Sequence, residues 1–463
     1  MAGQTEGGVL TPPATAAPPA GPSAGANAGA GPSGPLARLR SAARTPPGRL
    51  RAAGALLAAL VLLFGLAASW QSAGRSSATR QLASRSEPLS QDAAELYRSL
   101  ADADATAAAG FLMAATEPPE VRKRYQDDLA TASRLIPRAA ARSGSSAEAQ
   151  RRLAELAQQL PRYAGLVETA RAINREGLPL GGAYLRYASD YMRQTVLPNA
   201  QGLADTEAAA LRADYEAADA VPWAAMVLGV AALAALGRYQ VLLFRRTKRV
   251  FNPGLLAASL AVLVALGWTV GGIASAGNDL YRARLQGIDP LRELNLVRVE
   301  ALQAHTAENL NLVSRGATEA YRVRWDELAK TLNEDSGRFP GSVAYLLTAP
   351  PAQSRQQLSE AARWFGEWQQ RHAAAAKLDE DGKYEETLAK TLAPGRDDTA
   401  QAAFDAADRQ WELAGRAEQA AFEAAVDGVD TGLAVQAVAV ALLAVLAAGG
   451  TVRGIGRRLA EYR

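Results

Sequence analysis

The amino-acid sequence predicts an all-α integral membrane protein with four transmembrane helices and two extracytoplasmic up-down helical bundles. Four apolar stretches lie at residues 52–70, 221–244, 254–274 and 431–450, and each is long enough to cross the roughly 30 Å hydrocarbon core of a bilayer. A first long polar segment lies between the first and second stretches, and a second lies between the third and fourth. In both segments alanine is abundant and apolar residues recur at helical spacing, which favours helices over strands.

The chain therefore divides into nine expected segments. They are, in order, a disordered basic cytoplasmic tail (1–51), a transmembrane helix (52–70), an extracytoplasmic helical bundle (71–220), a transmembrane helix (221–244), a basic cytoplasmic link (245–253), a transmembrane helix (254–274), a second extracytoplasmic helical bundle (275–430), a transmembrane helix (431–450) and a cytoplasmic tail (451–463).

The N-terminal tail is expected to be disordered because residues 1–35 consist mainly of Pro, Gly, Ala and Ser and hold too few large apolar side chains to form a core. Thr11 and Thr45 each precede a proline, so phosphorylation is an alternative to their being plain tail residues. A cleaved signal peptide is the alternative to a first span. The apolar run begins some 50 residues into the chain and lacks a small-x-small cleavage site, and Trp70 after it is typical of an interfacial anchor, so a retained span is favoured.

Basic residues beside the apolar stretches predict the orientation. The link between the second and third stretches carries Arg245, Arg246, Lys248 and Arg249 and no acidic residue, and both terminal tails are also rich in arginine. Because such residues mark the cytoplasmic side, we expect a multi-pass protein of the cell membrane with both termini in the cytoplasm.

The net charge of +3 and the pI of about 9.1 reflect this topology. Residues 71–220 hold 18 basic and 19 acidic residues, and residues 278–430 hold 18 and 26. The parts expected to face outward are thus not basic, which removes the support for a nucleic-acid partner. The absence of cysteine excludes disulfides, thiol catalysis and cysteine metal sites.

Spacing and helix-breaking residues predict the helices inside each bundle. A seam with steps of three and four residues, typical of a coiled coil, runs through Leu153, Leu156, Leu160, Tyr163, Val167 and Ala170. Helices are expected to end at Pro118–Pro119, 143–146 and 177–182 in the first segment, and at 335–341, Pro350–Pro351, 381–382 and Pro394–Gly395 in the second. About four main helices per bundle follow from these breaks.

The inventory of reactive groups predicts no catalytic residue, cofactor or metal site. His305 and Glu308 share a helix face at a spacing that can bind a metal, but no further ligand pattern completes a site, so a solvated or half-buried face is favoured. Asp102 and Asp104 point to different sides of a helix. The acidic run at 379–381, followed by glycine, is better explained by a helix–turn boundary than by calcium. We therefore expect a protein that is not an enzyme.

One face carries a speculative contact site for a small carboxylate or a partner protein. Tyr184, Tyr187 and Tyr191 share a helix face, and Arg186 and Arg193 lie beside them. The alternative is a stripe of bundle core whose hydroxyl groups reach water, and it is favoured.

The apolar stretches contain no charged residue well inside them, which argues against a transporter. Gly267 and Gly271, like Ala225 and Gly229, are small residues four apart, and such pairs allow helices to pack closely within one chain or in a homodimer.

The layout and three sequence segments resemble the GlnX family of four-span membrane proteins, which belongs to the actinobacterial amino-acid-sensing system. The segments are residues 96–104 (LYRSLADAD), 177–186 (GLPLGGAYLR, followed by Leu197–Pro198) and 308–316 (ENLNLVSRG). The resemblance implies a lipid-embedded relay with two partners, an extracytoplasmic glutamine-binding-type lipoprotein and the cytoplasmic serine/threonine protein kinase G. The outward segments are also similar to the four-helix sensory domains of bacterial chemoreceptors.

The distribution of mass predicts the class of function. Roughly 300 residues are expected outside, and the cytoplasmic pieces are too short to build a core of their own. We therefore expect a sensor and transducer subunit whose inner ends, including Arg245 to Arg249, are read by another polypeptide. The resemblance implies that the signal is an amino acid of the glutamate, aspartate or glutamine type. A scaffolding role in envelope assembly is the chief alternative, and a transporter subunit the next.

Overall fold

The computed structural model describes residues 46–113, 117–144, 146–219, 223–247, 252–283, 289–315, 319–333, 343–348 and 354–460. These residues are almost all helical and include no strand, which confirms the predicted all-α class. The helices are α2 (Pro46–Gln81), the π-helix η1 (Leu82–Ser86), α3 (Glu87–Met113), α4 (Pro119–Ser143), α5 (Ala147–Arg175), α6 (Leu180–Tyr191), the π-helix η3 (Met192–Val196), α7 (Leu197–Asp219), α8 (Trp223–Thr247), α9 (Pro253–Ala283), α10 (Asp289–Ser314), α11 (Ala320–Leu332), α12 (Val343–Thr348), α13 (Arg355–Glu380), α14 (Tyr384–Leu392) and α15 (Ala400–Ala460).

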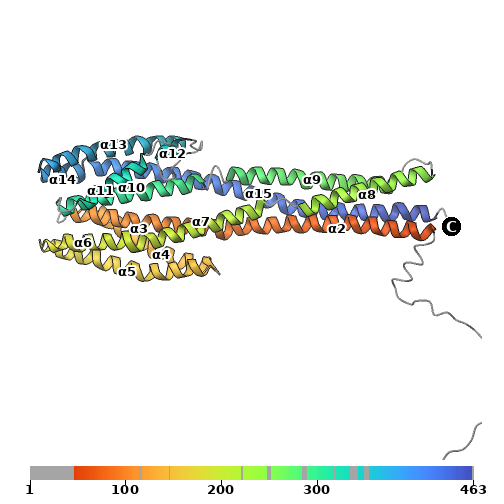
Figure 1. The fold of residues 1–463 in the computed structure, drawn as a ribbon, viewed down its shortest axis with the longest axis horizontal. Coiled ribbons are helices and arrows are strands. Elements are labelled where there is room, and N and C mark those ends of the chain that lie inside the picture. The colour runs from red at the N-terminus through yellow and green to blue at the C-terminus, as the bar shows by residue number, and fades with distance from the viewer. Residues whose placement is uncertain are drawn as a thin grey trace, which may run out of the picture.

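The molecule is elongated, and its two ends differ (Figure 1). At one end α3 to α7 and α10 to α14 pack with the first part of α15, and we call this region the head. At the other end α2, α8, α9 and the last part of α15 lie side by side, and we call them the span bundle. The end of the span bundle remote from the head holds the start of α2, the end of α8, the start of α9 and the end of α15 (Figure 1).

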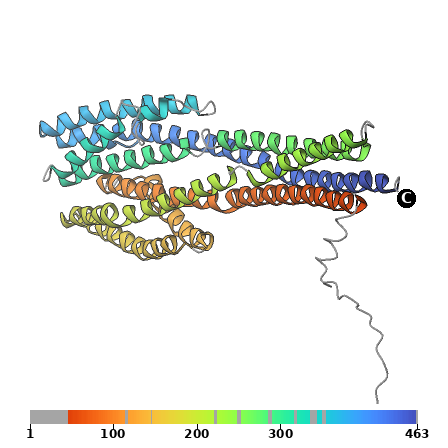
Figure 2. The ribbon, with the colours of Figure 1, turned by 45° about the vertical axis from the view of Figure 1, so that its right-hand side comes forward.

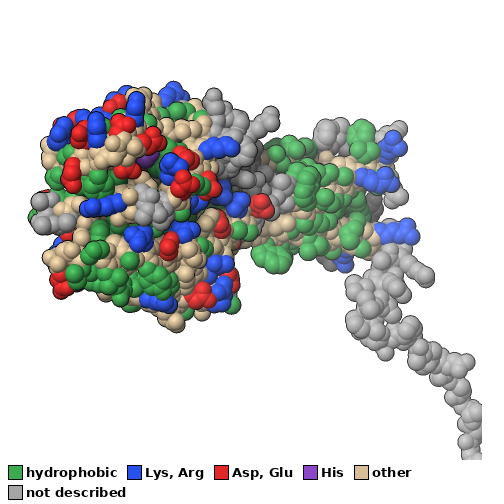
Figure 3. Space-filling model, turned by 60° about the vertical axis from the view of Figure 1, so that its left-hand side comes forward, with side chains coloured by type: hydrophobic (Ala, Val, Ile, Leu, Met, Phe, Trp, Pro, Cys, Tyr) green, Lys and Arg blue, Asp and Glu red, His purple; other side chains and the backbone are tan. Residues whose placement is uncertain are grey.

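Four helical windows are long and apolar enough to cross a membrane, and each overlaps one of the expected spans. They are Gly48–Ala78, Trp223–Arg245, Pro253–Gly272 and Val435–Arg457. Their outer surface is a belt of exposed apolar side chains, among them Leu66, Val230, Leu260 and Leu442 (Figure 3). Contact of such a belt with lipid costs less free energy than contact with water, as expected of a multi-pass membrane protein.

Small residues bring the span helices close together. A Cβ atom placed on Gly254 of α9 would lie 2.7 Å from the carbonyl oxygen of Gly450 and 2.7 Å from Cα of Gly454, both on α15. The side chain of Asn252 donates a hydrogen bond to the Gly454 carbonyl at 2.6 Å. The backbones of α9 and α15 therefore touch where the sequence supplies glycine on both sides.

The two small-residue pairs identified in the sequence differ in their surroundings. Ala225 is buried, and Gly229 lies against Phe64 of α2 and Leu266 of α9, so this pair packs inside the bundle. At Gly267 and Gly271, the described residues place no atom of a neighbouring element within 4 Å of an added Cβ atom.

The head has one core, to which both polar segments contribute. Leu96 and Leu100 of α3, Val297 and Leu302 of α10 and Trp411 of α15 belong to the same buried cluster and are each at most 1% exposed. Both ribbon views show the helices of residues 87–219 lying against those of residues 289–424 (Figures 1 and 2). The two segments therefore share one core, in which α3 of the first segment packs against α10 of the second.

Helix ends follow the predicted breaks where the structure describes them. Pro119 begins α4; α4 ends at Ser143, and the side chain of Ser146 accepts a hydrogen bond from the Ala149 amide as the cap of α5. The positive φ of Gly382 (+74°) follows the end of α13, which confirms the helix–turn boundary at 379–381. The six seam residues from Leu153 to Ala170 are all buried. The expected breaks at 335–341 and at Pro350–Pro351 lie outside the described residues, as do Thr11, Thr45 and the rest of the tail to residue 45.

Replacing Gly254 with alanine is expected to destabilise the span bundle by about 1–3 kcal/mol, because the added methyl group meets backbone atoms that cannot move aside. Gly267→Ala in the same helix is the matched control, expected to be neutral or to stabilise by up to ~1 kcal/mol through helix propensity. Unfolding free energies measured in detergent compare the two. Equal destabilisation by both variants would show that α9 and α15 do not make this contact.

Candidate functional site

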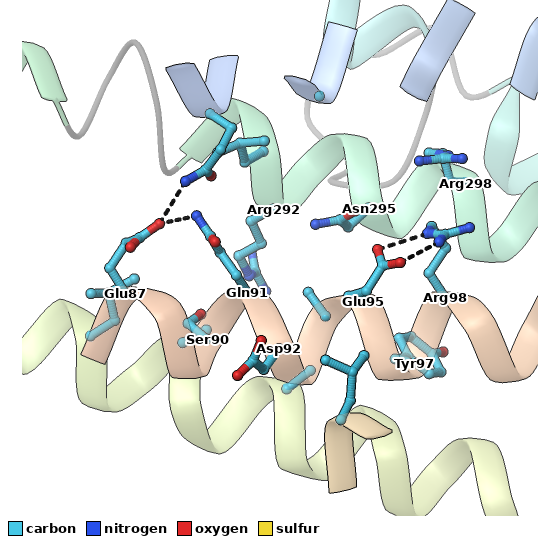
Figure 4. A pocket seen from close by; sticks show the side chains of 18 of the residues that line it. Glu87, Ser90, Gln91, Asp92, Glu95, Tyr97, Arg98, Arg292, Asn295 and Arg298 are labelled. Atoms are coloured by element: carbon cyan, nitrogen blue, oxygen red, sulfur yellow. Dashed lines mark hydrogen bonds and ion pairs between the residues drawn. The ribbon is translucent and has the colours of Figure 1, made fainter. Parts of the chain in front are cut away.

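A cavity of about 690 Å³ lies within the head, between the two polar segments (Figure 4). Its walls come from α3, α4 and α7 of the first segment and from α10 and α15 of the second. The lining includes Glu87 and Leu291, which lie close to the first residues of α3 and α10. The cavity is therefore at the end of the head that adjoins the span bundle.

The lining is strongly charged, with both signs present. Its seven arginines are Arg98, Arg134, Arg138, Arg212, Arg292, Arg298 and Arg416. Its six carboxylates are Glu87, Asp92, Glu95, Asp205, Glu412 and Glu423.

Buried carboxylates lie at one end of the cavity. Glu87 accepts hydrogen bonds from Gln91 and, at 2.9 Å, from Gln419 of α15 (Figure 4). Asp92 accepts a hydrogen bond from Arg142 at 2.8 Å. Burial raises the pKa of Glu87 and of Asp92, because a low dielectric disfavours the charged form.

Guanidinium groups surround Glu95 further along α3. Arg98 donates to Glu95 through Nε at 3.1 Å and through Nη2 at 2.5 Å, and Arg298 of α10 lies close by (Figure 4). Burial opposes the ionisation of Glu95. The bonds from Arg98 and the charges of Arg298 and Arg134 outweigh burial, so the pKa of Glu95 is lowered.

A partly buried charge network continues from this wall into the head and joins the two segments. Arg298 pairs with Asp408 of α15 at 2.9 Å. Arg124 of α4 pairs with Asp102 at 2.8 Å, with Asp405 at 3.0 Å and with Asp408 at 3.4 Å. Burial opposes charge on Asp408, but Arg298 and Arg124 outweigh it and lower its pKa. Arg98 also lies 3.7 Å from Asp102. We call Arg98, Arg124, Arg298, Asp102, Asp405 and Asp408 the interface network.

Asp104 lies on the other side of α3 from Asp102, as the sequence predicts. It accepts hydrogen bonds from Tyr163 at 3.0 Å and from Ser189 at 2.6 Å, so its partners belong to α5 and α6. Burial raises its pKa to about 6, although both hydroxyl groups favour the charged form. The two aspartates thus belong to separate networks and do not share a ligand.

A second charged cluster is buried farther from the span bundle, and it corrects an expectation. His305 and Glu308 were expected on a solvated or half-buried face, yet they are 1% and 4% exposed. Glu308 accepts hydrogen bonds from Nδ1 of His305 at 2.9 Å, from Nδ1 of His372 at 2.7 Å and from Nε1 of Trp368 at 3.0 Å. The rings of His305 and Phe404 are stacked 4.3 Å apart. The α13 partners of Glu308 are at least 60 residues away in sequence, so spacing along α10 could not reveal them.

Glu308 carries its charge in the core because two imidazoles face it. Burial opposes ionisation, but the charge of His372 and the hydrogen bonds from both histidines outweigh it and hold the pKa of Glu308 well below its usual range. Among the described residues, no group of three His, Cys, Asp or Glu side chains is arranged to hold a metal ion.

The tyrosine and arginine face predicted from the sequence lies on α6 and η3, away from the cavity. Tyr184 and Tyr191 pack partly buried against the head core. Tyr187 is exposed, and Arg162 of α5 donates to its hydroxyl at 3.3 Å and stacks on the ring of Tyr191. Arg186 is half-buried, and Arg193 is exposed and pairs with Asp190 at 2.8 Å. Tyr187 and Tyr191 thus share the contact with Arg162, and none of the five predicted residues lines the cavity described above.

The predicted basic contact residues lie at the end of α8 remote from the head. Arg245 is exposed there, and Arg246 follows it in the helix. Lys248 and Arg249 lie outside the described residues.

One comparison with known proteins gives a match. A family model described as an actinobacterial sensor domain matches residues 78–216, from the end of α2 to α7. No curated protein and no solved structure matches the chain. The matched residues include the helices that the first polar segment contributes to the head, among them the α3, α4 and α7 walls of the cavity. The match supports an actinobacterial sensor protein.

Replacing Glu308 with glutamine is expected to lower the unfolding free energy at pH 7, because two imidazoles lose their carboxylate. A lowered folded-state pKa stabilises the protein above the unfolded value of about 4.5, and this contribution is lost as pH falls below it. The difference between wild type and Glu308→Gln should therefore shrink as the pH falls below about 4.5. Denaturant titrations from pH 7 to pH 3 measure it. A difference that grows in acid would contradict this assignment.

Proposed function

We propose that the protein is a non-enzymatic transmembrane sensor and transducer subunit of the cell membrane. The observation that supports this best is the course of α15, a single helix of 61 residues from Ala400 to Ala460. At 1.5 Å per residue it is about 90 Å long. It contributes Trp411 to the head core, Gln419 to the cavity and Val440 to the core of the span bundle. A displacement of the cavity wall therefore has a direct mechanical route to the fourth span.

A second helical path starts on the opposite wall of the cavity. From Pro46 to Met113 the chain is helical throughout, as α2, η1 and α3. The π-helical turn at Leu82–Ser86 lies directly between the span and the cavity residue Glu87. π-Helical turns break the regular register of a helix and are frequent at functional sites. In the span bundle this path meets α15 again, where Ser69 Oγ donates to the Ala437 carbonyl at 3.2 Å.

The distribution of charge supports the expected orientation, with the head outside and both termini in the cytoplasm. At the end of the span bundle remote from the head, the exposed basic residues include Arg49, Arg51, Arg245, Arg453 and Arg457 (Figure 3). Basic residues flanking spans favour the cytoplasmic side.

For the signal and the partners, we infer a relay of amino-acid availability of the glutamate, aspartate or glutamine type. A solute-binding lipoprotein would contact the head, and a serine/threonine kinase would read the cytoplasmic ends near Arg245. The resemblance of three sequence segments to the GlnX family supports this inference, and the match to a sensor domain is consistent with it.

Envelope scaffolding is the second candidate, and one surface favours it. Between α5 and α6, at the far end of the head, Leu178 and Leu180 are 50% and 55% exposed. Exposed apolar side chains at such a tip are suited to holding a protein partner. A scaffold would bind its partners without regard to any small molecule, which separates the two candidates experimentally.

The sensor proposal predicts that fixing α2 to α15 blocks signalling. The chain has no cysteine, so Ser69→Cys with Ala437→Cys introduces a single pair that can be oxidised to a disulfide. Kinase activity that co-purifies with the protein from host membranes should change with L-glutamate, L-aspartate or L-glutamine in the reduced form and not in the oxidised form. The reduced protein is the matched control. If neither the amount of co-purified kinase nor its activity changes with any of the three amino acids, in the reduced or the oxidised form, the scaffold is favoured.

A further inference from the structure

The cavity between the segments has the size of a ligand site. Packed helices normally leave voids no larger than a few water molecules, whereas 690 Å³ lies inside the range of roughly 300–1,000 Å³ typical of small-molecule sites. Small side chains keep it open, since Ala94, Ala204, Ala208, Gly415 and Ala420 lie in its walls.

Several cations of the lining have no carboxylate partner across the cavity. Arg292 of α10 pairs with its own neighbour Glu293 at 3.0 Å. Arg134 of α4 and Arg212 of α7 are hydrogen-bonded, among the described residues, to Thr131 and to the Ala208 carbonyl of their own helices. Arginine stays protonated at every physiological pH, so these charges are permanent.

Three of the six carboxylates of the lining form ion pairs with arginines. Asp92 is held by Arg138 and Arg142, Glu95 by Arg98, and Glu412 by Arg416.

Of the other three lining carboxylates, two accept a hydrogen bond from the side-chain amide of Gln419, and the third is Asp205. Gln419 donates to both Glu87 and Glu423. Asp205 is exposed, and the described residues supply it with no hydrogen bond or ion pair. Seven arginines and six carboxylates thus line the cavity, and among the described residues Arg134, Arg212 and Arg292 bond only within their own helices. Half-buried Asn295 adds an amide beside Arg292 (Figure 4).

We propose that this cavity binds a small organic anion that carries at least one carboxylate, with Arg292 as its main partner. A planar carboxylate matches the two parallel N–H groups of a guanidinium, and Asn295 is placed to donate a further hydrogen bond. The bound anion would join the α3, α10 and α15 walls, which come from different segments. This last consequence rests on the proposed function, because it makes the cavity the input of the relay.

Binding to the isolated full-length protein tests the inference. In lipid nanodiscs without partner proteins, succinate and L-glutamate at millimolar concentration should raise the thermal unfolding midpoint in a saturable way, because a ligand that binds only the folded state stabilises it. Inorganic phosphate, with similar charge and different geometry, is the competing anion. Arg292→Gln should weaken carboxylate binding by about 10- to 100-fold, the loss expected for a charged hydrogen bond.

The matched control is Arg322→Gln, which removes an arginine of the head that also pairs locally, with Glu319 at 2.9 Å, and does not line the cavity. Asn295→Ala is the second test if Arg292→Gln fails to fold. Equal shifts in Arg292→Gln and Arg322→Gln, a shift with phosphate alone, or no shift with either carboxylate would overturn the inference. If the protein binds the carboxylate but kinase activity does not change with it, the relay is contradicted and the binding site is not.

Discussion

Asp408, buried on α15 and shared by Arg298 of α10 and Arg124 of α4, is the interaction on which the structure depends most. A buried ion pair adds little net stability, because desolvation offsets most of the attraction. Removing one partner is costly, at roughly 3–5 kcal/mol, because it strands the other charge. The network therefore supplies alignment more than stability, since only one relative position of the two segments pairs all of its charges.

This alignment fixes the geometry of the cavity and of the spans together. Arg98 and Arg298 belong both to the interface network and to the cavity lining, so an occupant of the cavity meets the groups that hold the segments in place. The helices that carry Glu87 and Gln419 continue into the first and fourth spans, where Ser69 and Ala437 are in contact. Local changes of charge are in this way connected to the packing of membrane helices.

The sequence predicts the helices and spans well because each depends on local patterns. Apolar runs, proline and glycine breaks and the seam from Leu153 to Ala170 need no knowledge of distant residues. The shared core, the cavity and the Glu308 cluster could not be predicted, because each is made by side chains from both segments or from helices far apart in the chain. His372 meets Glu308 only through the packing of α13 on the head core, and Arg124 meets Asp405 across 281 residues. Tyr187 and Tyr191 of α6 both contact Arg162, but periodicity gave no indication of where the cavity would form.

The central claim is that the two segments form a single cooperative head held in register by the interface network. Amide hydrogen exchange of α3 and α10, measured in wild type and in Asp408→Asn, tests it most directly, because exchange reports the free energy of local opening. The most protected amides of both helices should open with the same free energy, and Asp408→Asn should lower both by the same amount. Loss of protection in α10 with α3 unchanged would contradict the claim.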